Sequence, residues 1–229
     1  MTVVSPPTKP VDVTEHRVAS QRVRVKVCGI TSPDDALLAI ANGADAIGLV
    51  FYSASSRYVT IETARKIAMS VGPLVTVVGL FVDATRNEVE RVLRRVPLSL
   101  LQFHGDETAK FCCSINRPFI KAIRMDDNVD FPTLENEYKD ALGFLLDTYK
   151  PGQPGGTGEV FDWHRVPSSL TKPIIVAGGL NPENVSEAVE LTRPYAVDVS
   201  SGVESMPGKK DPEKIMRFIQ YAKYSNLSL

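Results

Sequence analysis

The sequence predicts a single-domain α/β protein, a (β/α)8 TIM barrel, on three observations. From residue 22 onward one unit recurs, an apolar strand followed by a polar turn and an amphipathic helix. Eight such strands fit a chain of 229 residues, which is within the size range of this barrel. The strands are nearly continuous apolar runs, as expected for a parallel sheet that is covered on both faces.

The predicted strands occupy eight short ranges: 23–30, 45–52, 75–82, 98–105, 119–125, 143–149, 173–179 and 196–202. A doubly wound open sheet is the alternative, but it usually has five or six strands, and no G-x-G-x-x-G motif follows the first strand here. The region after the sixth strand is the least regular. Only the segment FDWHRV, 161–166, offers a short helical piece before the seventh strand.

Start and stop signals support the helices between these strands. Ser32 is placed to cap a helix that begins at Pro33, and Gly43 is placed to end it. Similar starts at Thr60 and Asn181 open two further helices.

Residues 1–21 are expected to form a disordered N-terminal extension, and residues 22–229 the catalytic barrel domain. The extension is rich in Pro, Thr and polar residues and has no hydrophobic period. It also lacks the basic and apolar regions of a secretory signal.

Composition excludes several classes of protein. The formal net charge of −1 provides no electrostatic surface for nucleic acid or an anionic membrane. No apolar run approaches the roughly 18 residues needed to span a bilayer. Three cysteines, two of them adjacent, form neither a disulfide framework nor a C-x-x-C metal pair. We therefore expect a cytoplasmic protein in a reducing compartment, without nucleic-acid or membrane partners.

Two reactive side chains end strands at the face of the barrel where active sites form. Cys28 follows the first strand and Asp147 ends the sixth, so they are expected to face each other across the barrel mouth. They are suited to act as general base and general acid, which requires a cysteine pKa below its usual ~8.5. Lys26, on the same strand face as Cys28, is placed to favour the thiolate.

Each of these residues also has a structural alternative. Cys28 could be a small buried hydrophobe, and Asp147 could cap a turn. Lys26 could instead form an ion pair with Asp198 inside the barrel.

Glycine-rich turns predict a phosphate site. Turns after the seventh and eighth strands free backbone N–H groups near helix starts, where barrels commonly hold phosphate. A third such turn follows the sixth strand. The predicted phosphate-binding residues are Gly155, Gly156, Gly178, Gly179, Ser200, Ser201 and Gly202. The alternative is ordinary tight turns, and because no GK[ST] follows, the phosphate would belong to a substrate rather than to ATP.

Three further side chains are candidate substrate contacts. Arg57 is suited to clamp a carboxylate with two hydrogen bonds, the alternative being a solvated surface arginine. His104, at the end of the fourth strand, is a substrate contact or a structural histidine, and Asp198 is another candidate contact. No spacing of His, Cys, Asp or Glu suggests a metal site or a protease-like triad, so we expect acid–base chemistry with no metal and no cofactor.

Motifs along the chain resemble those of the phosphoribosylanthranilate isomerase family. They are KVCGIT, GLVFY with SSRYV, LQFHGDE, LLDT with GGTGEVFDW, VAGGLNPENV and AVDVSSGVES with PGKKD, in that order from Val23 to about Lys223. The family consists of (β/α)8 barrels of tryptophan biosynthesis. The resemblance implies a cofactorless Amadori rearrangement of N-(5′-phosphoribosyl)anthranilate to 1-(2-carboxyphenylamino)-1-deoxyribulose 5-phosphate.

The resemblance also implies roles for individual residues. By motif position, Cys28 is the general base, Asp147 the general acid and Arg57 the ligand of the anthranilate carboxylate. The phosphate falls on the glycine-rich turns. The expected partner is this small phosphosugar, and the sequence leaves a monomer and a homodimer open.

Three alternatives are weighed against this interpretation. An aminoaldose isomerase of histidine biosynthesis would use two carboxylates, and Cys28 stands in place of the first. Indole-glycerol-phosphate synthase would need a catalytic lysine at a strand end and a long N-terminal helical extension. A non-catalytic barrel that binds a sugar phosphate would keep the glycine turns but would not need the Cys28 and Asp147 pair.

Overall fold

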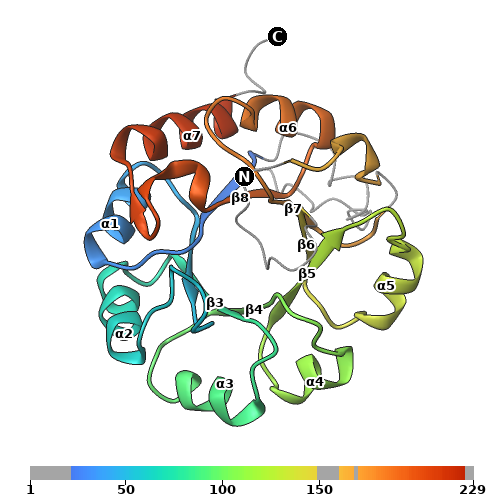
Figure 1. Ribbon diagram of the computed structural model, residues 1–229, viewed down its shortest axis with the longest axis horizontal. Coiled ribbons are helices and arrows are strands. Elements are labelled where there is room, and N and C mark those ends of the chain that lie inside the picture. The colour runs from blue at the N-terminus through green and yellow to red at the C-terminus, as the bar shows by residue number, and fades with distance from the viewer. Residues whose placement is uncertain (1–21, 149–159, 168–169, 225–229) are drawn as a thin grey trace, which may run out of the picture.

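Eight parallel strands close into a barrel in the computed structural model, which describes residues 22–148, 160–167 and 170–224. Each strand pairs with its neighbours in chain order, and the eighth pairs with the first (Figure 1). The strands are β1 (Arg24–Val27), β2 (Ala46–Val50), β3 (Thr76–Phe81), β4 (Leu100–Phe103), β5 (Phe119–Met125), β6 (Phe144–Thr148), β7 (Ile174–Val176) and β8 (Ala196–Val199). The predicted TIM barrel is confirmed.

Helices surround the barrel as an outer ring (Figure 1). They are α1 (Pro33–Ala41), α2 (Ile61–Ser70), α3 (Arg86–Leu93), α4 (Ala109–Ser114), α5 (Phe131–Glu137), α6 (Val185–Thr192) and α7 (Pro212–Tyr224). The segment between β6 and β7 contributes the short 3-10 helix η2 (Trp163–Arg165), as its weak helical pattern suggests. After β8 come the 3-10 helix η3 (Ser201–Val203) and a small hairpin, β9 (Glu204–Met206) with β10 (Lys209–Lys210), which the sequence did not predict.

The predicted helix caps are confirmed at α1 and α2, and one predicted start is wrong. Ser32 accepts a hydrogen bond from the Asp35 N–H at 3.2 Å, and Gly43 ends α1 with a φ of +100°. Helix α6, however, begins at Val185 rather than directly after Asn181. The Asn181 side chain caps a separate turn, accepting the N–H groups of the two residues before α6.

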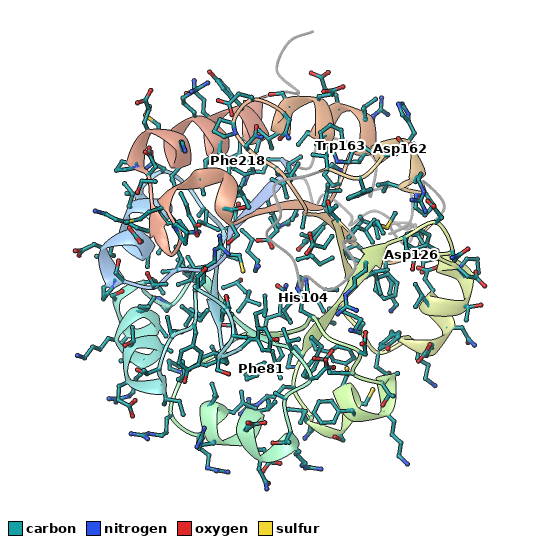
Figure 2. All side chains as sticks on the ribbon, viewed as in Figure 1. Phe81, His104, Asp126, Asp162, Trp163 and Phe218 are labelled. Atoms are coloured by element: carbon teal, nitrogen blue, oxygen red, sulfur yellow. The ribbon has the colours of Figure 1, made fainter. Side chains whose placement is uncertain are left out.

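The apolar residues form an outer core and an inner core. The outer core lies between strands and helices and includes Phe81 and Phe218, whereas His104 lies towards the centre of the ring (Figure 2). Along β4, Leu101 and Phe103 belong to the outer core and Leu100 packs with the inner one. This alternation directs every second strand residue into the barrel.

Two predicted features lie outside the described residues. One is the N-terminal extension 1–21, and the other is the turn that carries Gly155 and Gly156.

Candidate active site

Cys28 lies directly after β1 at the C-terminal mouth of the barrel. Its side chain is 5% exposed and packs in a small apolar cluster with Val50 and Leu80. Gly48 on the neighbouring strand makes room for the sulfur, because a Cβ there would lie 2.6 Å from the Cys28 Sγ. The thiol is therefore both buried and at the predicted position.

A buried ion pair lies next to the Cys28 thiol. Strand register places Lys26 opposite Asp198, and the Lys26 Nζ donates to the Asp198 Oδ1 at 2.9 Å. This interaction is the alternative that the sequence offered for Lys26. Burial lowers the pKa of Lys26, but the Asp198 carboxylate and the Cys28 sulfur outweigh burial and raise it overall, so the ammonium stays charged.

Burial raises the pKa of Cys28 above its usual value, although Lys26 acts to lower it. The requirement of a lowered cysteine pKa is therefore not met in this structure. The reason is that burial in the apolar cluster removes water from the sulfur, which disfavours the thiolate more strongly than Lys26 and Lys210 favour it.

Asp147 lies one residue before the end of β6, in a polar environment. Its Oδ1 accepts a hydrogen bond from the Thr148 N–H at 2.9 Å, and its Oδ2 lies 3.0 Å from the His104 Nε2. Gly178 packs against the same carboxylate, because a Cβ there would lie 2.9 Å from the Asp147 Oδ1. The structure therefore joins two predicted site residues, His104 and Asp147, by a direct contact.

Asp198 lies on β8 opposite Lys26, and its carboxylate interacts electrostatically with Cys28, Asp147 and His104. We call Asp147, His104 and Asp198 the polar floor of the barrel mouth. Cys28 lies at the same mouth, in its apolar cluster.

Arg57 is not a solvated surface arginine. Its Nε and Nη2 bind the two oxygens of Glu204 at 2.8 and 2.7 Å, and the Lys210 Nζ binds the same carboxylate at 2.9 Å. Burial acts to raise the pKa of Glu204, but the hydrogen bonds from the two cations outweigh it and hold this pKa below its usual value.

The arginine is also held against the first strand end. A Cβ on Gly29 would lie 2.5 Å from the Arg57 Cδ and 3.0 Å from the Ser200 Oγ. Gly29 has a φ of +72°, so both backbone and space require glycine here. This contact brings Arg57 next to Cys28 and to one predicted phosphate loop.

The two described phosphate loops lie side by side. Gly178 and Gly179 adopt φ values of +76° and +66°, and neither uses its N–H in a hydrogen bond to another described residue. A Cβ on Gly202 would collide with the carbonyl oxygen of Leu180, so the loop after β8 packs directly on the loop after β7. Ser200 and Ser201 begin the η3 turn in the same place. The arrangement leaves free N–H donors at the neighbouring ends of β7 and β8.

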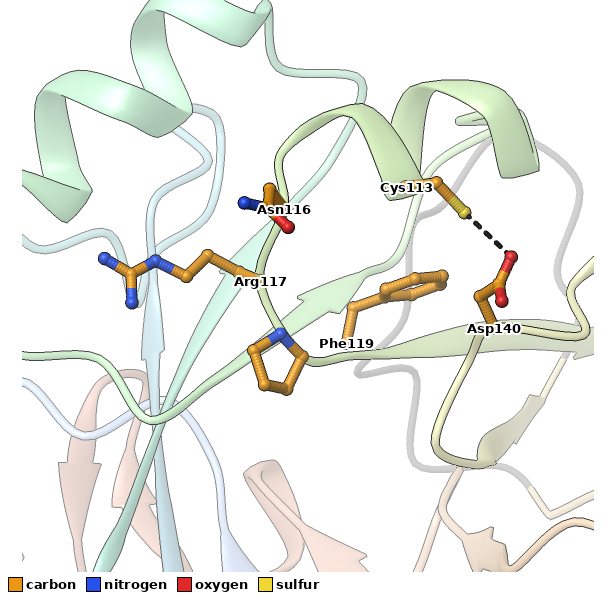
Figure 3. Close-up of a pocket in the computed structure, with 6 residues that line it drawn as sticks. Cys113, Asn116, Arg117, Phe119 and Asp140 are labelled. Atoms are coloured by element: carbon orange, nitrogen blue, oxygen red, sulfur yellow. Dashed lines mark hydrogen bonds between the residues drawn. The ribbon is translucent and has the colours of Figure 1, made fainter.

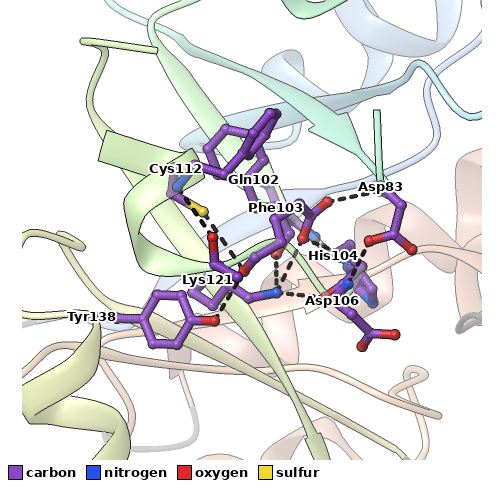
Figure 4. A network of polar contacts seen from close by, with 12 residues as sticks. Asp83, Gln102, Phe103, His104, Asp106, Cys112, Lys121 and Tyr138 are labelled. Carbon is purple, nitrogen blue, oxygen red and sulfur yellow. Dashed lines mark hydrogen bonds and ion pairs between the residues drawn. The ribbon is translucent and has the colours of Figure 1, made fainter. Parts of the chain in front are cut away.

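A buried network supports the loop that carries His104 (Figure 4). The Lys121 Nζ donates to the carbonyl oxygens of Phe103 and Gly105 and to the Glu107 Oε2, at 3.4, 2.6 and 3.2 Å. Glu107 in turn accepts the backbone N–H groups of Asp83 and Gly105, each at 2.9 Å. The network ties the ends of β3, β4 and β5 together.

A cavity of about 310 Å³ lies away from this mouth, at the entrance to β5 (Figure 3). Its lining residues are Cys113, Asn116, Arg117, Pro118, Phe119 and Asp140. None is a predicted site residue.

Sequence reasoning did not select Glu204, Lys210 or Gln102. The first two lie in the β9–β10 hairpin, where Glu204 falls in the family motif AVDVSSGVES and Lys210 in the motif PGKKD. Within the described ranges, no group of three His, Cys, Asp or Glu side chains could hold a metal ion. Across the same ranges, none of the helices has the length and apolar character to cross a membrane.

Comparison with known proteins identifies the family of this chain. The sequence model of N-(5′-phosphoribosyl)anthranilate isomerase matches residues 25–221, nearly the whole barrel. The chain belongs to this family. The predicted family is therefore confirmed, and so is the expectation that the protein is an isomerase of tryptophan biosynthesis.

Named phosphoribosylanthranilate isomerases are similar over most of their length. The relative from Pseudomonas fluorescens is 56% identical over 207 residues, 90% of this chain and 99% of that protein. The relative from Cellvibrio japonicus is 54% identical over 207 residues, 90% of this chain and 96% of that protein.

Solved isomerases share the fold. The enzyme from Thermotoga maritima is 42% identical, with a TM-score of 0.81 over 88% of this chain and 98% of that one. A phosphoribosylanthranilate isomerase in complex with reduced 1-(o-carboxyphenylamino)-1-deoxyribulose 5-phosphate is 41% identical, with a TM-score of 0.78 over the same shares.

Proposed function

We propose that Asp147 and Cys28 are the general acid and general base of this isomerase. The reaction converts N-(5′-phosphoribosyl)anthranilate to 1-(2-carboxyphenylamino)-1-deoxyribulose 5-phosphate. The observation that carries the proposal is that the closed parallel barrel brings Cys28, directly after β1, and Asp147, near the end of β6, to the same mouth. At this mouth lie the arginine and the glycine loops that the two ends of such a substrate require.

The acid step uses Asp147. The protonated carboxyl donates to the furanose ring oxygen, the bond from that oxygen to C1′ breaks, and the nitrogen lone pair forms the Schiff base. The hydrogen bonds from Thr148 and His104 then stabilise the carboxylate that remains.

The base step uses Cys28. The thiolate removes the C2′ proton to give an enolamine, which ketonises to the product. A cationic Schiff base placed beside the sulfur would add to the effect of Lys26, which already acts to lower the Cys28 pKa. Substrate therefore favours the thiolate that burial disfavours in the free enzyme.

Two anchors hold the reacting carbon between acid and base. The phosphate is assigned to the free N–H donors of Gly178 and Gly179 together with Ser200, Ser201 and Gly202. Arg57 is assigned to the anthranilate carboxylate. Because Glu204 occupies its Nε and Nη2, the remaining edge of the guanidinium is the one that faces substrate.

His104 and Asp198 are assigned to the substrate-binding floor. The mechanism requires no metal or organic cofactor, since proton transfers account for every step. The further proposals, a cytoplasmic location and a monomer or homodimer, rest on the sequence. One solved relative from Thermotoga maritima is described as a dimeric phosphoribosylanthranilate isomerase, studied as generated monomers.

A fluorescence assay tests the activity. Incubation of phosphoribosylanthranilate with the protein should remove the anthranilate-type fluorescence, and the variant with both Cys28→Ala and Asp147→Asn should not. Equal rates for the two proteins, both correctly folded by circular dichroism, would contradict the assigned acid and base.

A further inference from the structure

Gln102 reaches the general acid through one intervening histidine. This glutamine is fully buried on β4 and points into the barrel, two residues before His104 on the same strand face. Its Nε2 lies 2.8 Å from the His104 Nδ1, and the His104 Nε2 lies 3.0 Å from the Asp147 Oδ2. Figure 4 shows Gln102 and His104 together on the network that holds the loop after β4.

The chemistry of the contacts determines the tautomer of His104. An amide nitrogen can only donate, so the Nδ1 that faces it must be the acceptor. The proton of the neutral ring then lies on Nε2, which donates to the Asp147 Oδ2.

An unpaired atom supports this orientation of the amide. The Gln102 Oε1 is buried and has no hydrogen-bond partner among the described residues. Rotating the amide would place Oε1 on the ring but would leave an NH2 group with two donors in the partnerless position. The present orientation leaves the carbonyl and one N–H without a partner, whereas the rotated one would leave both N–H donors unpaired. Because an unpaired buried N–H is rarer in folded proteins than an unpaired carbonyl, the present orientation is favoured.

The two oxygens of Asp147 have different environments. Oδ1 accepts the Thr148 N–H at 2.9 Å and Oδ2 accepts the His104 Nε2–H at 3.0 Å, so neither contact takes up the acidic proton of the carboxyl group. A donor at His104 Nε2 cannot accept that proton, so the proton is directed away from the histidine and towards the substrate.

We propose that Gln102 is a positioning residue for the acid step, fixing His104 as the Nε2–H tautomer that holds the Asp147 Oδ2. As Asp147 gives its proton to the ring oxygen and the C1′–O bond breaks, the His104 N–H stabilises the carboxylate that forms. Gln102 itself touches neither substrate nor reacting atoms. The inference rests on the proposed role of Asp147.

The tautomer can be measured without any variant. Nitrogen NMR of protein labelled at histidine should show His104 protonated on Nε2 only, with its signal identified among the chain's three histidines by His104→Ala. A His104 ring protonated on Nδ1 would overturn the proposal.

Two replacements of similar size test the kinetic consequence. Gln102→Glu presents an acceptor to Nδ1 and should move the proton to that nitrogen, while Gln102→Met removes the hydrogen bond. We expect kcat to fall about 10- to 100-fold in each variant with KM unchanged, the scale of positioning contacts around a reactive group. Leu145→Met, in the inner core on β6 and itself part of neither hydrogen bond of His104, is the matched control for packing.

The outcomes separate the proposed role of Gln102 from the proposed role of Asp147, on which it rests. If Asp147→Asn kept a near-wild-type kcat, Asp147 would not be the general acid and both proposals would fail. An inactive Asp147→Asn beside a fully active Gln102→Glu would overturn only the role of Gln102. A loss of kcat in Gln102→Met equal to that in Leu145→Met, with the tautomer unchanged in both, would assign Gln102 to packing alone.

Discussion

The two sides of the barrel mouth activate their reactive groups by different means. The Cys28 side is a small apolar cluster, where burial raises the pKa of the thiol and Lys26 and Lys210 act against it. The Asp147 side is a chain of hydrogen bonds through Thr148 and His104. The proposed acid is thus held by preformed contacts, whereas the proposed base would depend on charge brought by the substrate.

The largest effects are expected from removing the reactive groups themselves. Cys28→Ala and Asp147→Asn should each lower kcat by about 100-fold or more, since positioned acids and bases contribute ~10²–10⁴-fold. Phosphate affinity and the unfolding midpoint should change little. Steady-state kinetics by fluorescence check this, and near-wild-type turnover in either variant removes that residue from the mechanism.

Replacing the carboxylate clamp should affect binding more than turnover. Arg57→Ala should weaken substrate binding by ~2–5 kcal/mol, because the buried anthranilate carboxylate of the substrate would lose its charged partner. The measurement is KM, with Arg217→Ala as a control whose guanidinium lies on α7 in an ion pair with Glu183. An unchanged KM would place Arg57 in a structural role with Glu204.

The pKa of the base can be followed by alkylation. Because the Cys28 pKa is raised, the thiolate is scarce at neutral pH, and its reaction with iodoacetamide should quicken about tenfold per pH unit below that pKa. The variant Cys113→Ser removes the exposed competing thiol. Buried Cys112, whose pKa burial raises to about 12, should react only on unfolding. A Cys28 rate that is flat between pH 6 and 8 would show a lowered pKa instead.

The smallest effect concerns acid stability at the Arg57 anchor. The pKa of Glu204 is lower in the folded state than its unfolded value of about 4.3. Its contribution to the free energy of unfolding is therefore present above that pH and is lost as pH falls through the folded pKa.

Urea unfolding of the wild type and of Glu204→Gln measures this contribution. The stability gap between them should be largest near pH 7 and should shrink below pH ~4. Glu183→Gln, which breaks an exposed ion pair with Arg217, should show no such pH-dependent gap. A difference in the free energy of unfolding between the wild type and Glu204→Gln that stays constant down to pH 3 would contradict a lowered pKa for Glu204.

Local patterns in the sequence were sufficient for the barrel and for the strand ends. Apolar runs and cap residues act over a few positions, so the eight strands and the start of α1 were predictable. The same reasoning placed Cys28 and Asp147 at strand ends. It misplaced the start of α6, because Asn181 satisfied a turn of its own before the helix began.

Only the closed barrel decided which side chains meet. Lys26 pairs with Asp198 across 172 positions of sequence, Arg57 with Glu204 across 147, and His104 with Asp147 across 43. These pairs follow from strand register and from a hairpin with little local signal. Desolvation is likewise a property of the packed molecule. The residue types alone predicted a thiolate at Cys28, but the apolar cluster around the sulfur raises its pKa instead.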